Sequence, residues 1–286
     1  MRAISITAGA QRGASRIGFW LGILLLGVWL LGPILWMAIA SVQPEAAVTT
    51  APPELTWHLD FGWYSQFLQD SEWLRSTFVS LKVSIATTAA TIVIGSLAAY
   101  PLARLEVPGR NGIMLILIAT LMMPPIVLLI PVLFMAREVH LTDTVTALVL
   151  VNTAFLLPLV IWLLFHFFRE VPKSIESAAR IDGCTRLGTL FRITIPAAAP
   201  GISATAILIL IGTWNEFLFA LILGDRDAVT VTRRIAFIEA PAAGAGAPPI
   251  TAVAAAGILA VLPCLLLVFF FHRRIVTGIS EAFMKG

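Results

Sequence analysis

Residues 145–168 read VTALVLVNTAFLLPLVIWLLFHFF, and no Asp, Glu, Lys or Arg occurs among them. A helix needs roughly 20 predominantly apolar residues to cross the ~30 Å hydrocarbon core of a bilayer, and this run is long enough to do so. The stretch therefore predicts a membrane-spanning helix. Further apolar runs lie on both sides of it in the sequence.

The composition of the whole chain supports the same interpretation. Hydrophobic residues make up 59% of the 286 residues and charged residues only 12%, whereas an ordinary soluble domain has roughly 25% charged residues. A single soluble core could not bury so many apolar side chains. This composition excludes a soluble enzyme, a nucleic-acid-binding protein and a disordered protein.

Six apolar runs are long enough to span a bilayer, which predicts an all-α, polytopic membrane protein. The first run follows Arg12 and Arg16 and could be taken for a signal peptide. It is longer than the usual apolar region of ~7–15 residues and lacks a clear small-residue cleavage site, so we expect a retained helix. The six predicted spans are 17–40, 79–102, 113–135, 145–168, 201–223 and 252–272.

The basic residues predict the orientation of these spans. With the N-terminus inside, 13 of the 19 Lys and Arg residues fall on the inner side and 6 on the outer side. The positive-inside rule then makes residues 1–16 and 273–286 a cytoplasmic N-terminus and a cytoplasmic tail. This topology accounts for the net charge of +3, so no nucleic-acid partner is needed. The long segments on the outer side are 41–78 and 225–251.

Motifs that bind a nucleotide phosphate or a metal are missing from the sequence. No G-x-x-x-x-G-K-[ST] occurs, so any ATP must be used by another chain. The histidines are isolated, and an isolated histidine near a membrane end is ordinarily an interfacial residue rather than a ligand. We therefore expect this chain to bind no cofactor or metal and to contain no catalytic residue.

The loop between the fourth and fifth spans, 169–199, is the most informative segment. Within it, VPKSIESAARIDG at 171–183 predicts a short surface helix. Pro172 suits the first turn of such a helix, and Gly183 can adopt the left-handed conformation that ends one.

The side chains of this short helix favour docking to a partner. Glu176 and Arg180 have the spacing of a favourable i,i+4 ion pair. One side of the helix is expected to carry two small alanines, which let another surface approach closely. A solvated loop is the alternative, but small residues on a helix beyond the membrane favour a docking surface. The residues expected on that side are Ile175, Ala178, Ala179 and Asp182.

The run 176–183, followed nine residues later by I-x-I-P at 193–196, resembles the EAA loop of ABC-importer permeases, roughly E-A-A-x-x-x-G-x9-I-x-L-P. RLEVPGR at 104–110, WNEFL at 214–218 and the tail 278–286 resemble the carbohydrate-importer branch of this family. Within that branch the chain is similar to the smaller, maltose-importer-type permease subunits. The resemblance implies the type I ABC-importer permease fold.

The sequence departs from the family pattern at one position, because Ser177 stands where the family has glutamate. Glu176 lies about 100° away around a helix of about 3.6 residues per turn, so it does not simply replace that carboxylate. The resemblance implies that the loop docks on an ATPase subunit and that the family glutamate contacts an ATPase arginine. The implied ATPase-coupling residues are Glu176, Ser177, Ala178, Ala179, Asp182, Gly183 and Pro196.

The resemblance implies a gate without bond chemistry in a bacterial inner (plasma) membrane. The partners would be a sister permease subunit, two ATPase subunits that hydrolyse ATP with Mg²⁺, an external sugar-binding protein and membrane lipid. The outer run 242–249 resembles the family loop that reaches into the binding protein. The alternatives are a permease for another polar solute, or a secondary transporter, which would need coupling carboxylates near the midplane.

Four residues within the predicted spans could line a substrate pathway. Ionisable groups at membrane depth ordinarily face a bundle interior or an aqueous cavity. An indole face suits sugar C–H surfaces, and an asparagine side chain both donates and accepts hydrogen bonds. The same groups could equally bond one helix to another or anchor a helix at the interface. The residues are Asn152, Trp214, Asn215 and Glu216.

Overall fold

The structure is a computed structural model that describes the backbone of residues 4–238 and 248–283 and the side chains of residues 18–238 and 248–270. The regular elements of these described residues are all helices, which confirms the all-α prediction. The chain divides into two compact units, which we call unit 1 (Met1–Phe67 with Ile238–Leu259) and unit 2 (Leu68–Phe237 with Ala260–Gly286).

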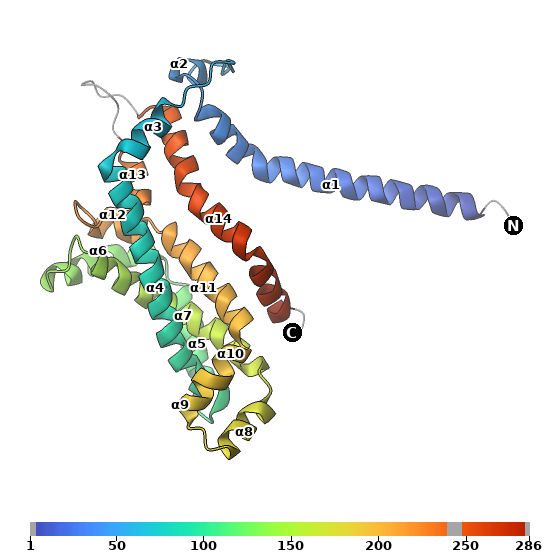
Figure 1. Ribbon diagram of the computed structural model, residues 1–286, viewed down its shortest axis with the longest axis vertical. Coiled ribbons are helices and arrows are strands. Elements are labelled where there is room, and N and C mark those ends of the chain that lie inside the picture. The colour runs from blue at the N-terminus through green and yellow to red at the C-terminus, as the bar shows by residue number, and fades with distance from the viewer. Residues whose placement is uncertain (1–3, 239–247, 284–286) are drawn as a thin grey trace. The chain divides into compact units, whose positions relative to one another are not determined.

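Three long helices that pack against one another form the core of unit 2 (Figure 1). Their apolar composition requires burial or lipid, and their inward sides meet in continuous apolar clusters. The three are α4 (Ser71–Arg104), α7 (Val145–Glu170) and α11 (Ala199–Trp214).

The two longest of these helices, α4 and α7, run in the same direction. Val83 and Leu148, in the first halves of α4 and α7, share one buried apolar cluster. Tyr100 and Phe168, near their ends, share the other cluster. Parallel neighbours need a connection that returns along their length, and the segment between them supplies it.

Two glycines allow the three core helices to approach closely. A Cβ added at Gly95 of α4 would lie 2.6 Å from Cγ1 of Val160 in α7. A Cβ at Gly201 of α11 would overlap the ring of Phe167 in α7. Small residues at such crossings bring helix backbones together, which is how helices associate in lipid.

The connection between α4 and α7 is bent rather than straight. The sequence predicts one span over 113–135, but the structure has α5 (Arg110–Leu121) and α6 (Pro125–Glu138), bent by 92°. The cause is the pair Pro124 and Pro125, since proline has no N–H to donate and disfavours helical geometry in the residue before it. The prediction of a continuous third helix is therefore wrong.

The predicted fifth span, 201–223, is also interrupted. Helix α11 ends at Trp214, and α12 (Leu218–Leu223) begins after a break. Before α11, the segment Arg186–Ala197 meets it at an angle of 80°. The short elements of unit 2 are α8 (Lys173–Ile181), α9 (Arg186–Thr189), the π-helix η1 (Leu190–Thr194), α10 (Ile195–Ala197) and α13 (Val231–Ala236).

Unit 1 folds around the start of α14 (Ile250–Phe283). The Glu45 carboxylate accepts hydrogen bonds from the backbone N–H groups of Ile250 (2.9 Å) and Thr251 (3.0 Å), which satisfies donors that a helix start leaves open. The Trp63 indole N–H donates to the hydroxyl of Thr251 at 3.1 Å. The unit also contains α1 (Ile4–Ala40), α2 (Glu45–Val48) and, at its edge, α3 (Gly62–Gln69).

Four helices of the described residues are long and apolar enough to cross a membrane, or six if each of two bent pairs forms one span. The helix predicted at 145–168 is observed as α7, Val145–Glu170. Helices α1, α4 and α14 extend beyond the predicted ends of their spans. Hydropathy marks only the apolar part of a helix, whereas backbone hydrogen bonding continues through polar residues.

Candidate coupling site

The loop predicted to dock a partner contains the expected short helix, α8, and both ends of this helix form as predicted. Helix α8 starts after Pro172 and ends at Ile181, with Asp182 as its C-cap residue, and Gly183 has φ 90°. The N–H of Gly183 donates to the carbonyl of Arg180 at 3.2 Å and that of Cys184 to the carbonyl of Ala179 at 3.0 Å. The predicted left-handed end of the helix is confirmed, because these bonds satisfy carbonyls that a helix end otherwise leaves open.

The two sides of α8 differ sharply in exposure. Glu176 and Ala179 are 8% and 7% exposed, because they pack toward the chain's own bundle. Ala179 therefore does not share the exposed side on which the sequence pattern grouped it, and its part in ATPase coupling stays a prediction. The outer side carries exposed Ile175, Ser177, Ala178, Ile181 and Asp182.

The spacing of Glu176 and Arg180 predicts an ion pair, but in the structure the Glu176 carboxylate has a different partner. Its Oε1 lies 2.9 Å from Nε of Arg104, the last residue of α4. The same oxygen accepts a hydrogen bond of 2.7 Å from the hydroxyl of Thr194. The Glu176 carboxylate is buried against the bundle, whereas the Arg180 side chain is exposed.

Arg104 is almost completely enclosed at this point. Its side chain is 4% exposed and that of Glu176 is 11% exposed. The guanidinium Nη2 donates to the carbonyl of Val171 at 2.5 Å. Its Nε contacts the carboxylate at ion-pair distance but makes no aligned hydrogen bond, so this contact is a charge interaction.

After α9 the loop returns to the bundle through the π-helix η1 and then Pro196. Thr194 is the last residue of η1 and is fully buried. Pro196 follows in α10 with its side chain exposed. The chain then bends by 80° into α11. A short π-helix shifts the register of the helical hydrogen bonds and is frequent at functional sites.

Three of the predicted pathway residues make contacts within the chain. Asn152 is 2% exposed and donates to the carbonyl of Leu148 at 2.9 Å. The indole of Trp214 donates to the carbonyl of Ala260 at 3.0 Å. Asn215 donates to the carbonyl of Ile211 at 2.8 Å, but its side chain is exposed.

Glu216, the fourth pathway residue, caps the start of α12. Its two carboxylate oxygens accept hydrogen bonds from the N–H groups of Phe219 (2.7 Å) and Ala220 (3.1 Å). A carboxylate at a helix start satisfies open donors and complements the helix dipole. The anchoring alternative therefore has a structural basis for these residues, while their part in a pathway stays a prediction.

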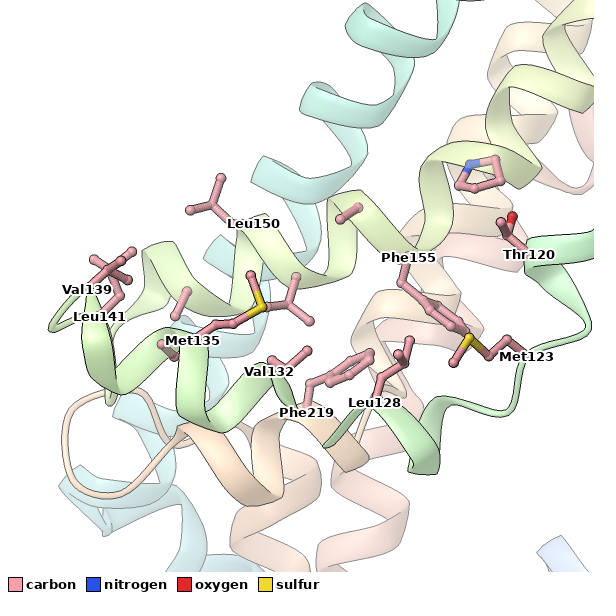
Figure 2. A pocket seen from close by; sticks show the side chains of 15 residues that line it. Thr120, Met123, Leu128, Val132, Met135, Val139, Leu141, Leu150, Phe155 and Phe219 are labelled. Atoms are coloured by element: carbon pink, nitrogen blue, oxygen red, sulfur yellow. The ribbon is translucent and has the colours of Figure 1, made fainter. Parts of the chain in front are cut away.

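An apolar cavity of about 490 Å³ lies in unit 2 between α5, α6, α7 and α12 (Figure 2). The rings of Phe155 and Phe219 pack edge to face at its wall, with centroids 5.8 Å apart. Thr120 is the one hydroxyl-bearing side chain in the described lining, and none of the four predicted pathway residues takes part. A sugar needs several hydrogen-bonding groups, so this cavity does not have the chemistry to hold one.

At the opposite end of unit 2 from α8, one carboxylate organises a loop. Asp143, between α6 and α7, accepts hydrogen bonds from the N–H groups of four consecutive residues, 225–228. Burial opposes its ionisation, but the donors of Ala228, Asp227, Asp225 and Arg226 outweigh it and lower the pKa of Asp143 to about 2. The predicted outer run 242–249 falls for the most part outside the described residues.

Sequence reasoning did not identify Arg104, Thr194 or Asp143 as site residues. Arg104 was part of the segment RLEVPGR, and its place at the end of an apolar run with acidic and basic neighbours was the one available signal. Thr194 and Asp143 carried none, because their partners lie far from them in sequence.

Comparison with known proteins identifies the family. The family model described as "Binding-protein-dependent transport system inner membrane component" matches residues 91–281. The sulfoquinovosyl glycerol transport system permease protein SmoH of Agrobacterium fabrum is 35% identical over 258 residues, which cover 89% of this chain and 88% of that protein. The trehalose transport system permease protein SugB of Mycobacterium tuberculosis is 33% identical over 279 residues, 96% of this chain and 100% of that protein.

The fold also matches a solved structure, that of a bacterial ABC transporter involved in the import of the acidic polysaccharide alginate. One of its chains superposes with a TM-score of 0.71 at 21% identity and covers 91% of this chain and 97% of that one. This likeness supports the predicted importer-permease fold. By the family match and the two relatives, the chain belongs to the binding-protein-dependent transport system inner membrane components, which are multi-pass translocation subunits and not enzymes.

Proposed function

We propose that this chain is a permease subunit that imports a carbohydrate, in an ATP-driven importer of a bacterial inner membrane. Its substrate class is supported by the names of its relatives, among them SmoH, SugB and the trehalose/maltose transport system permease protein MalG of Thermococcus litoralis, which is 31% identical over 274 residues. The family description supports an extracytoplasmic binding protein as the source of the sugar.

The observation that carries the coupling part of the proposal is the outer side of α8. Ile181 is 86% exposed and Ile175 is 47% exposed, on a polar loop outside the apolar spans. Between them lie the small residues Ser177 and Ala178. An apolar surface with small residues, presented by a helix that is fixed from behind, suits a protein partner. We assign that partner as an ATPase subunit, with Asp182, Gly183 and Pro196 holding the shape of the surface.

In the assembled importer this chain pairs with a sister permease and with two ATPase subunits, which bind and hydrolyse ATP with Mg²⁺. The excess of basic residues on one side of the predicted spans supports a cytoplasmic position for α8 and both termini. The segment around Asp143 then faces the binding protein. This chain transmits the closure of the ATPases to the spans and forms part of the gate.

Among the four predicted pathway residues, we propose Asn215 as the one that contacts the substrate. Its side chain is exposed next to the break between α11 and α12, whereas Asn152 and Trp214 are buried. Glu216 positions this break by capping α12. A sugar hydroxyl could exchange hydrogen bonds with the amide of Asn215, which both donates and accepts.

Transport by the reconstituted complex tests the function. The chain, its sister permease, the ATPases and the binding protein are assembled in proteoliposomes with labelled di- and oligosaccharides. We expect uptake that needs ATP and the binding protein and is unaffected by ionophores. Uptake driven by an ion gradient without the ATPases would indicate a secondary transporter and contradict the proposal.

A steric variant tests the docking surface. Ala178→Trp should abolish co-purification of the ATPase, because it places an indole on the surface that the partner approaches. The matched control is Gln66→Trp, an equally large change at an exposed residue of unit 1. ATPase retained by Ala178→Trp at the level of the control would exclude α8 as the docking helix.

A further inference from the structure

One buried carboxylate joins three separate elements behind the proposed docking surface. Oε1 of Glu176, in α8, contacts Nε of Arg104 at the end of α4 (2.9 Å) and accepts from the hydroxyl of Thr194 at the end of η1 (2.7 Å). Arg104 also holds the carbonyl of Val171, where α7 ends. We call Arg104, Glu176 and Thr194 the buried triad.

Because the triad is buried, the loss of one of its charged partners is expected to be costly. The side chains of Arg104 and Glu176 are 4% and 11% exposed, and Thr194 is fully buried. Removing one partner of such a pair leaves an uncompensated charge in a low-dielectric setting, whereas removing both charges together does not. A surface pair would be screened by solvent and would tolerate either loss.

The position of the triad suits the transfer of motion. Thr194 is the last residue of the π-helix η1, which precedes the 80° bend into α11. Arg104 terminates α4, the longest helix of the unit 2 core. A displacement of α8 therefore reaches α11 through Thr194 and α4 through Arg104. A single rigid link to two core helices moves them together instead of letting the loop slide over the bundle.

The same geometry separates docking from transmission. Ser177 and Ala178 point outward, while Glu176 is turned inward on the same helix. Glu176 is therefore not available to an ATPase arginine. Its carboxylate is already occupied by two partners of its own chain.

We propose that Glu176 is a positioning residue that, through Arg104 and Thr194, clamps α8 to α4 and to the start of α11 and so transmits ATPase movement to the gate. This inference rests on the proposed function and deepens it. It predicts that breaking the clamp leaves the ATPase bound but lowers transport per ATP hydrolysed. The two claims are tested separately. ATP-dependent sugar uptake by the wild-type complex tests the proposed function, and the variants of the triad then test this inference.

The experiment compares neutralising and charge-exchanged variants in the reconstituted complex. Glu176→Gln keeps the shape and removes the charge, and we expect ATPase binding to stay within about twofold while sugar transported per ATP falls about tenfold. The exchange Arg104→Glu with Glu176→Arg should recover part of the transport that either single change loses. The matched control is Glu170→Gln, an exposed acid of the same loop, which should change neither quantity.

A second variant keeps the test decisive if Glu176→Gln does not assemble. Thr194→Val removes one hydroxyl without changing charge, and Thr194→Ser restores the donor. We expect Thr194→Val to lower transport per ATP and Thr194→Ser to return it to the wild-type value. Loss of ATPase binding in Glu176→Gln with unchanged transport per bound ATPase would assign Glu176 to docking. Wild-type coupling in both Glu176→Gln and Thr194→Val would also overturn the proposal.

Discussion

The carboxylate of Asp143 accepts a hydrogen bond of 2.9 Å from the backbone N–H of Ala228, far away in the sequence. Asp143 lies between α6 and α7, and Ala228 lies in the loop after α12. The backbone of Asp143 itself donates to the carbonyl of Leu223 at 2.7 Å. One residue therefore ties two connecting segments, so that they form a single surface at that end of unit 2.

This relationship predicts a pH-dependent contribution to stability. The folded pKa of Asp143 is about 2, below the ~3.9 of an unfolded aspartate. The contribution is therefore complete above pH ~3.9 and is lost as the pH falls toward the folded pKa. Asp143→Asn should lower the free energy of unfolding by about 1 kcal/mol at neutral pH, discounted for solvent exposure. Thermal unfolding of both proteins between pH 7 and pH 2.5 measures this, and a difference independent of pH would contradict it.

The crossing of α7 and α11 predicts a steric effect at one glycine. Gly201→Ala would place a methyl group into the ring of Phe167, and such overpacking typically costs about 1–3 kcal/mol. Gly212→Ala, in the same helix with open space around its Cα, should instead be neutral or stabilising by up to about 1 kcal/mol. Thermal unfolding of the two variants provides the comparison, and equal effects would disprove the close approach.

The end of α8 predicts a purely conformational effect. Gly183 has φ 90°, and no atom lies within 4 Å of the position that a Cβ would take, so strain rather than contact decides what it tolerates. Gly183→Val should cost about 1–2 kcal/mol in the left-handed region and lower uptake per ATP, because the helix end shifts. Gly183→Asn should retain most activity, since asparagine enters this region more readily. Normal uptake by the complex that carries Gly183→Val would remove the turn from the coupling mechanism.

The departure at Ser177 predicts a gain of binding that depends on salt. Ser177 is exposed on the outer side of α8, so Ser177→Glu should strengthen ATPase association if the partner keeps the arginine that the resemblance implies. An exposed ion pair contributes about 0–1 kcal/mol, so the gain is several-fold at most. It should shrink with salt, because exposed charges are screened over ~10 Å at 0.1 M. Binding measured at two salt concentrations is the assay, with Ser174→Glu as the control.

Absence of a gain at low salt would mean that the partner ATPase lacks the matching arginine or that the sister permease carries the family glutamate. A carboxylate buried there without a partner would then be neutral or unfavourable. Either result leaves the family assignment intact, because that assignment depends on the match over residues 91–281.

Local patterns in the sequence determined the class of the protein and much of its helix layout. The uncharged run 145–168 predicts α7, observed as Val145–Glu170, because bilayer thickness sets the length of an apolar helix. Gly183 predicts the end of α8 because its backbone geometry is decided within a few residues. The bend at Pro124 and Pro125 had a local signal too, but continuous hydropathy across it favoured a single span.

The tertiary structure alone decided which faces meet. Glu176 and Arg180 have the spacing of an ion pair, yet the carboxylate lies against Arg104 and Thr194. The same packing turns Ala179 inward and leaves Ser177 outward. Spacing along a helix tells which residues share a side, but which side is buried depends on the neighbouring helices. A buried charge then pairs with whichever opposite charge the packing encloses with it, because an unpaired charge in the interior is strongly unfavourable.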